Sequence, residues 1–269
     1  MGLTECKAQL AVPHLHCYSE GRVVKVNRSA QEAPAILVQG LTRSFGGPPV
    51  LYDLDLRVDW GELFVLFGAN GSGKTTLIRS LATLARFDSG HIQIAGRDLR
   101  ANAVSLRRSI GVLTHQTFLY DDLTAHENLR FYGRMFRVPE LEARIRSVAD
   151  QMGLHRLLHK RVRTLSHGIQ KRLSLARAIL HDPPILLLDE PETGLDQEAL
   201  ALLDGLLTGE NRARRAVVMT THNLDRGLVL GDRVAILADG RIAYQQSRGS
   251  FDTEGFRGAY ARYLSEVST

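Results

Sequence analysis

Short runs of consecutive apolar residues alternate with helix-length stretches through the second half of this 269-residue chain. The apolar runs have the length of buried strands, and the stretches between them carry helical periodicity. In order, the expected elements are a strand at 185–188, a helix at 197–207, a strand at 216–220, a helix at 223–230 and a strand at 233–238. This alternation predicts an α/β fold with a mostly parallel sheet core and helices on both faces.

The first half of the chain shows a second strand pattern. Within residues 51–58, Leu54, Leu56 and Val58 alternate with charged residues, which is typical of a strand with one buried face. Further strands are expected at 36–38, 63–67, 91–94 and 110–113. Helical periodicity then runs from 125 to about 160, with breaks at Pro139 and Gly153. We therefore expect an antiparallel β subdomain and an inserted helical subdomain, at about 117–180, beside the parallel sheet.

Three regions are expected along the chain. Residues 1–33 have scattered polar positions without a sustained period, so we interpret them as an N-terminal extension that is flexible. The cluster His14-Leu15-His16-Cys17 offers one compact group without a second ligand pair, which argues against a metal site. Residues 34–245 form the predicted domain, and 246–269 a C-terminal tail with a short helix.

Composition and cysteine content place the chain among globular proteins. Hydrophobic residues make up 44% and charged residues 23%, and no apolar run approaches the roughly 20 residues of a membrane span. No secretory signal is visible at the N-terminus. The two cysteines, Cys6 and Cys17, indicate no disulfide framework, so a reducing, cytosolic location is expected.

Positive charge is concentrated in one part of the chain. The formal net charge is +5, and residues 130–177 hold twelve Lys or Arg against three acids. Three interpretations are open, namely a solvated helical face, a surface for anionic lipid headgroups, or a nucleic-acid surface. The aromatic residues Phe131, Tyr132 and Phe136 all lie at the start of this stretch. That spacing indicates a core and no stacking platform for bases, so no nucleic acid is expected.

One segment carries a phosphate-binding pattern. It follows the apolar run at 63–67, precedes a helix expected at 75–85, and matches the P-loop pattern G-x-x-x-x-G-K-[ST]. Its residues are Gly68, Ala69, Asn70, Gly71, Ser72, Gly73, Lys74, Thr75 and Thr76. The glycines let backbone N–H groups point at phosphate oxygens, Lys74 reaches the β- and γ-phosphates, and the Thr75 hydroxyl ligates Mg²⁺. The alternative is a glycine-rich turn without a ligand.

A second motif supplies two acids at the end of a strand. The run at 185–188 ends in Asp189 and Glu190. Asp189 suits Mg²⁺, which prefers oxygen ligands and keeps bound water. Glu190 is placed to polarise an attacking water. After a P-loop, this pair predicts hydrolysis of a nucleoside triphosphate.

Three more motifs follow in order. Gln116 comes after the strand at 110–113, residues 165–172 open a helix before the acidic strand, and His222 comes after the strand at 216–220. With these motifs, residues 35–245 resemble the nucleotide-binding domains of the ATP-binding cassette (ABC) family. The resemblance implies ATP and Mg²⁺ as ligands, and it implies roles for particular residues. Phe45 stacks on adenine, Gln116 contacts the metal, and His222 lies near the γ-phosphate as a catalytic residue beside Glu190 and Lys74. Ser166, Gly168 and Asp196 complete the ATP site of a second copy, in trans. Two copies are therefore required, as a homodimer or with a second ATPase subunit.

The signature motif departs from the family's usual Leu-Ser-Gly-Gly-Gln. His167 replaces the first glycine and Ile169 the glutamine. The Ser166 hydroxyl and the N–H groups at the start of the expected helix remain available for phosphate. We therefore expect a working site. Ala69 stands where many members carry proline, which we interpret as neutral.

A single cassette without a membrane span resembles the ATPase subunit of a transporter whose membrane domains are separate chains. Such a subunit lies peripherally on the cytoplasmic face of the cell membrane, and its helical subdomain contacts transmembrane permease subunits. Residues 114–132, 181–184 and 193–197 are similar to the ATP-binding subunits of the bacterial haem exporter of cytochrome c maturation. The alternative is a soluble, non-transport ABC ATPase that acts on nucleic acid or ribosomes. A P-loop kinase is a third alternative, but it leaves Ser166, Gly168 and His222 unexplained.

Overall fold

The computed structural model describes residues 16–19, 22–25, 33–209, 214–250 and 252–266. The chain divides into two units, Met1–Ala33 and Pro34–Thr269. In the first unit, the strands β1 (His16–Ser19) and β2 (Arg22–Lys25) form an antiparallel hairpin that the sequence did not predict. The other residues of the predicted N-terminal extension before Ala33, including His14 of the histidine cluster, lie outside those described.

The second unit is built on a six-stranded sheet with the order β12-β11-β5-β10-β9-β8. Its strands are β5 (Leu63–Phe67), β8 (Ile110–Leu113), β9 (Ile185–Asp189), β10 (Ala216–Thr220), β11 (Arg233–Ala238) and β12 (Arg241–Ser247). The strands from β11 to β8 are parallel, and β12 is antiparallel to β11. The largely parallel sheet predicted from the sequence is therefore confirmed.

Alternate residues of each central strand enter two different cores. In β5, Val65 and Phe67 belong to the core on the side of the helical subdomain, whereas Phe64 and Leu66 belong to the core shared with the antiparallel sheet. All five residues of β5 are buried. A strand with both faces covered must be apolar at every position, which explains the continuous apolar runs in the sequence.

The second core lies beneath a four-stranded antiparallel sheet with the order β4-β3-β6-β7. Its strands are β3 (Ile36–Arg43), β4 (Leu51–Val58), β6 (Ser89–Ile94) and β7 (Arg97–Asp98). In β4 the side chains of Leu54, Leu56 and Val58 are buried and their charged neighbours are exposed, as the alternation predicted. Helix α1 (Lys74–Leu81) contributes Leu77 to this core, and α2 (Leu99–Leu106) follows β7.

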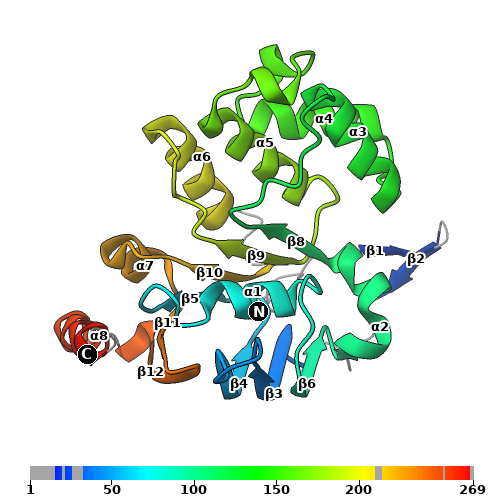
Figure 1. The fold of residues 1–269 in the computed structure, drawn as a ribbon. Coiled ribbons are helices and arrows are strands. Elements are labelled where there is room, and N and C mark those ends of the chain that lie inside the picture. Colours follow the sequence, from blue (N-terminus) through cyan, green and yellow to red (C-terminus); the bar gives the residue numbers. More distant parts are fainter. Residues whose placement is uncertain (1–15, 20–21, 26–32, 210–213, 251, 267–269) are drawn as a thin grey trace, which may run out of the picture. The chain divides into compact units, whose positions relative to one another are not determined.

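The helical subdomain consists of three packed helices, α3 (Ala125–Phe136), α4 (Leu141–Gln151) and α5 (His167–Ile179), at the top of Figure 1. Thr124 and Glu127 form a reciprocal capping box at the start of α3. Pro139 lies in the gap between α3 and α4, and Gly153, with φ of 64°, follows α4. Short 3-10 turns occur at Arg107–Ser109, His155–Leu157 and Val162–Thr164.

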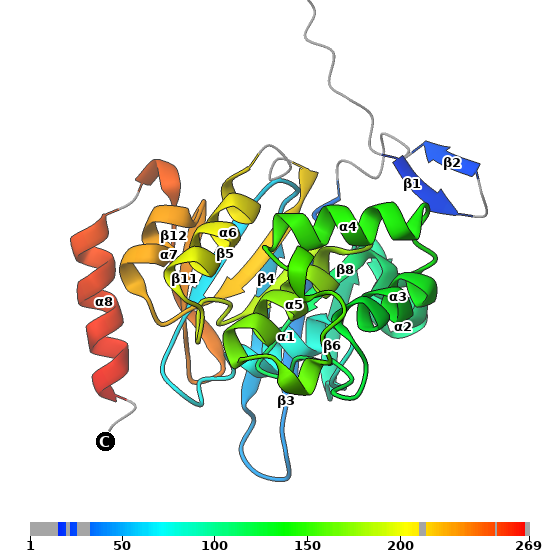
Figure 2. The ribbon, with the colours of Figure 1, turned by 90° about the horizontal axis from the view of Figure 1, so that it is seen from above.

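The remaining helices are α6 (Gln197–Thr208), α7 (Leu224–Leu230) and α8 (Thr253–Glu266), with a 3-10 turn at Arg248–Ser250. The short helix expected in the C-terminal tail is in fact 14 residues long. It packs on the domain, because Phe256 is fully buried with its ring centroid 5.5 Å from that of Phe67. Figure 2 shows α8 along the β12 side of the sheet. In the part of the chain described here, no helix has the length and apolar character to cross a bilayer.

Candidate nucleotide site

The P-loop connects the end of β5 to the start of α1, and at two of its positions only glycine fits without a clash. Gly73 is the N-cap of α1 with φ of 107°, and a Cβ there would lie 2.8 Å from the Val50 carbonyl oxygen. A Cβ on Gly68 would lie 2.5 Å from the Leu237 oxygen and 2.6 Å from Ser72 Oγ. Since real Cβ atoms do not approach so closely, side chains are excluded where the backbone curls.

This curl leaves several donors without protein acceptors. Among the described residues, the N–H groups of Gly71, Gly73, Lys74 and Thr75 form no hydrogen bond, and Ser72 Oγ is buried without a partner. Unpaired N–H groups at a helix start carry partial positive charge and attract anions. The loop therefore fits the phosphates of a nucleotide.

Lys74 projects back over the same loop. Its Nζ donates to the carbonyl oxygens of Gly68 at 2.8 Å and Ala69 at 2.9 Å, and the side chain is only 5% exposed. Desolvation lowers the pKa of this ammonium, while the charges of Glu190 and Asp189 act in the opposite direction. A triphosphate beside Lys74 would supply the anionic partner that a buried ammonium requires.

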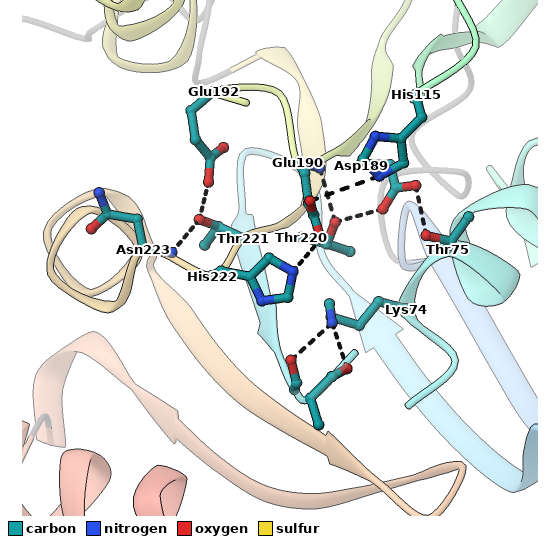
Figure 3. Close-up of polar contacts among 12 residues, drawn as sticks. Lys74, Thr75, His115, Asp189, Glu190, Glu192, Thr220, Thr221, His222 and Asn223 are labelled. Atoms are coloured by element: carbon teal, nitrogen blue, oxygen red, sulfur yellow. Dashed lines mark hydrogen bonds and ion pairs between the residues drawn. The ribbon is translucent and has the colours of Figure 1, made fainter. Parts of the chain in front are cut away.

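Asp189 ends β9 and is completely buried. Its Oδ2 accepts a 2.8 Å hydrogen bond from Thr75 Oγ1, and its Oδ1 accepts one of 2.8 Å from Thr220 Oγ1 at the end of β10 (Figure 3). The carboxylate and hydroxyl oxygens are the hard ligands that Mg²⁺ prefers, and Mg²⁺ completes its shell with waters and phosphate oxygens. The residues present therefore fit a magnesium ion.

Glu190 follows with its backbone held in the left-handed region at φ of 47°. Its N–H donates to the carbonyl oxygen of Thr220 at 3.1 Å and to Thr220 Oγ1 at 3.0 Å. The carboxylate is 15% exposed, and His222 Nε2 contacts its Oε1. The Nε2 atom of His115 lies 3.7 Å from Oε2 (Figure 3).

The loop that carries His222 is held by its neighbours. Thr221 Oγ1 donates to Glu192 Oε1, and the N–H of Asn223 donates to Thr221 Oγ1 at 2.9 Å. The Asn223 side chain caps α7 by accepting from Arg226 N–H. These bonds fix the backbone on both sides of His222, next to Glu190.

The three residues assigned to the partner's site lie at the starts of α5 and α6. Ser166 is the N-cap of α5, and its hydroxyl accepts from Ile169 N–H at 3.4 Å. A Cβ on Gly168 would lie 3.5 Å from the Gly194 oxygen, so the signature segment and the loop before α6 are adjacent. Asp196 caps α6 and pairs with Arg172 at 2.7 Å. The N–H of Ala199 and the bonds from Arg172 lower the pKa of Asp196.

The structure brings together only part of the predicted set. Lys74, Thr75, Asp189, Glu190 and His222 form one connected group. Hydrogen bonds through Thr220 link the last four, and Lys74 joins them through the charges of Glu190 and Asp189. In the described part of the chain, no side-chain hydrogen bond joins exposed Gln116 to this group. The Phe45 ring is 65% exposed under the Arg43 guanidinium, at 4.4 Å. Among the described residues, the signature segment forms no hydrogen bond or ion pair with the P-loop of the same copy.

Sequence reasoning missed three members of the site. Thr220 bonds both Asp189 and Glu190, His115 faces Glu190, and Lys171 Nζ donates to the Glu190 carbonyl oxygen at 3.4 Å. Burial lowers the pKa of Lys171, while the charges of the nearby carboxylates act to raise it. Their positions could have identified two of them, because Thr220 ends β10 and His115 follows β8, and these two strands flank β9 in the sheet.

Comparison with known proteins agrees with this geometry. The family model described as "ABC transporter" matches residues 51–193. The ABC transporter ATP-binding protein NatA of Bacillus subtilis is 33% identical over 72% of this chain and 80% of its own length. The daunorubicin resistance ATP-binding protein DrrA3 of Streptomyces coeruleorubidus is 35% identical, over 77% of this chain and 66% of its own. The Nod factor export ATP-binding protein I of Rhizobium meliloti is 37% identical, over 77% and 62%.

Solved structures show the same fold. The ATP-binding subunit of an ABC transporter superposes with a TM-score of 0.75 and 28% identity, over 87% of this chain and 98% of that one. A dimeric ATP-binding cassette in a post-hydrolysis state, bound to ADP and Pi, superposes with a TM-score of 0.72 and 25% identity, over 80% and 100%.

The chain belongs to the ABC transporter family and is an ATP-binding subunit of that family. It is an ATPase domain whose ligands are ATP and Mg²⁺. The match spans less than two thirds of the DrrA3 and Nod factor export proteins' own lengths.

Proposed function

We propose that this protein is the ATP-hydrolysing subunit of an ABC transporter and powers transport through separate membrane subunits. The observation that carries the chemistry is the connected group of Lys74, Thr75, Asp189, Glu190 and His222 beside a P-loop with free N–H groups. Its place is the cytoplasmic face of the cell membrane, as a peripheral subunit.

In this proposal each side chain has one task at the nucleotide. The free N–H groups of the P-loop (Gly71, Gly73, Lys74 and Thr75) and the Lys74 ammonium bind the phosphates and offset their charge. Thr75, Gln116 and Asp189 hold Mg²⁺, which supplies a positive charge that orients the phosphates. Glu190 accepts the proton of the water that attacks the γ-phosphorus, and His222 holds the Glu190 carboxylate and lies towards the γ-phosphate. Phe45 stacks on adenine.

One copy does not complete the site. The N–H groups of His167 and Gly168 at the start of α5 have no acceptor among the described residues, and Ser166 lies beside them. In a two-copy arrangement, Ser166, Gly168 and Asp196 of the partner would close over the γ-phosphate. The dimeric relative bound to ADP and Pi supports this arrangement. ATP would then hold two copies together, and hydrolysis would release them.

The cargo is chosen by the membrane partner in this account. The sequence resemblance to haem exporter subunits stays a prediction, and none of the ten histidines is assigned to haem. Relatives named for Nod factor export and daunorubicin resistance make export the direction that we favour.

The transport proposal is tested by purification from membranes. Tagged Glu190→Gln protein would be loaded with ATP and used as bait in solubilised membranes of the native host. Lys74→Ala protein, whose affinity for ATP should be reduced, is the matched control, used at an ATP concentration that loads only the bait. Co-purification of a multi-spanning membrane protein with the bait would support the proposal and point to the cargo. Recovery of only soluble protein or RNA would contradict it and favour a non-transport ATPase.

A further inference from the structure

Two imidazoles flank the Glu190 carboxylate, one at each oxygen (Figure 3). His222 contacts Oε1, and His115 Nε2 lies 3.7 Å from Oε2. We infer that His115 is a positioning residue that holds the second oxygen and so fixes the orientation in which Glu190 accepts a proton. This inference rests on the proposed function, since it takes Glu190 as the base.

The contact of His115 with Glu190 orients the Glu190 side chain and contributes little to the stability of the fold. The Glu190 backbone is already fixed by its two bonds to Thr220, so only the side-chain torsions remain free. At 3.7 Å, the distance from His115 Nε2 to Glu190 Oε2 is within ion-pair range but beyond a direct hydrogen bond. His115 is 52% exposed, so its truncation leaves no cavity in a core.

His115 stands where the sheet connects to the helical subdomain. Thr114, beside it, is buried and donates through Oγ1 to the Gln116 carbonyl oxygen at 3.1 Å. The next residues are tied to the helices, because Ser174 of α5 donates to the Thr117 oxygen and Tyr132 of α3 donates to the Phe118 oxygen. A shift of α3 and α5 would therefore change the distance from His115 to Glu190.

Steady-state ATP hydrolysis by purified His115→Ala and His115→Gln proteins tests the inference. We expect His115→Ala to lower kcat roughly tenfold, a fraction of what a general base supplies, with KM for ATP unchanged. Glutamine keeps a side-chain N–H donor near Oε2, so His115→Gln should recover most of the lost kcat. An equal loss of kcat in both variants, or a change confined to KM, would overturn the inference. His91→Gln, on an exposed position of β6, should match the wild type.

Two further proteins separate this inference from the proposed function. If Glu190→Gln hydrolyses ATP at the wild-type rate, the base assignment fails and the role of His115 fails with it. If Glu190→Gln is inactive while His115→Ala matches the wild type in kcat, only the His115 inference fails. In the double variant, His115→Ala should add no loss to Glu190→Gln, because the two act through one carboxylate. An independent additional loss would contradict that coupling.

Discussion

Thr75 Oγ1 donates a 2.8 Å hydrogen bond to Asp189 Oδ2, joining the first turn of α1 to the last residue of β9 across 114 positions of sequence. The bond sets the distance between the P-loop and the acidic strand end. The two oxygens are those assigned to Mg²⁺, so the site is arranged for the metal by the fold itself.

Replacement of Lys74 by alanine should weaken ATP binding. Lys74 is the buried cation of the P-loop, and a charge-assisted hydrogen bond contributes about 1.5–3 kcal/mol, so the Kd should rise roughly 10- to 100-fold. Equilibrium titration with a fluorescent ATP analogue measures this. Lys160→Ala, at an exposed position, should bind as the wild type does. Unchanged affinity in Lys74→Ala would remove the P-loop from the account.

Replacement of Glu190 by glutamine should lower turnover and leave binding intact. An amide has nearly the shape of the carboxylate but does not accept a proton, so kcat should fall by about 10²–10⁴-fold. Phosphate release and nucleotide titration, run in parallel, separate the two effects. Glu140→Gln, exposed before α4, is the matched control. Normal turnover in Glu190→Gln would show that another group is the base.

Replacement of Asn128 by alanine should destabilise the fold. Asn128 is fully buried, and its amide bonds both the N–H and the carbonyl oxygen of Tyr120 and the carbonyl oxygen of Thr124. Loss of these bonds should cost about 3 kcal/mol, because buried backbone groups are left unpaired. Urea unfolding followed by circular dichroism tests this, with exposed Gln151→Ala as control. Equal stability of Asn128→Ala and the wild type would be the contrary result.

Stability should fall in acid partly through His181. Burial lowers the pKa of His181 to about 4 from its usual value of 6.5, while its ring stacks on Phe136. The folded state therefore binds the proton less well than the unfolded state. The contribution of neutral His181 to the free energy of unfolding is fully present above pH 6.5. It is lost as the pH falls towards 4, at up to about 1.4 kcal/mol per pH unit.

The free energy of unfolding, measured at intervals across that pH range, checks this prediction. His181→Gln should show a smaller slope of stability against pH than the wild type, and His91→Gln should keep the wild-type slope. Identical slopes in all three proteins would mean that His181 is not the titrating group.

The sequence predicted the parallel strands well because burial on both faces leaves a continuous apolar run, as in β5, β9 and β10. It predicted β4 because one exposed face leaves an alternation. Strand β12 alternates only weakly, and the two-residue β7 has no pattern, so neither was expected.

Contacts at the site were less predictable than the motifs. His115 lies near Glu190 only because β8 and β9 are neighbours in the sheet. The order of strands is set by the tertiary fold, which no local sequence pattern shows. The pair of Arg172 with Asp196 likewise joins two helix starts that lie 24 residues apart. Sequence motifs predict which residues bind the nucleotide. The residues that position those side chains are brought together only by tertiary packing.

The central claim is that ATP is bound between two copies of this chain. The most direct test is the molar mass in solution of Glu190→Gln protein with saturating Mg-ATP, measured by light scattering during size exclusion. We expect the mass of two chains with ATP and the mass of one chain without nucleotide. We also expect that Ser166→Arg, placed at the start of α5, abolishes the ATP-dependent dimer. A mass of one chain at saturating ATP, or a dimer that Ser166→Arg leaves intact, would contradict the account.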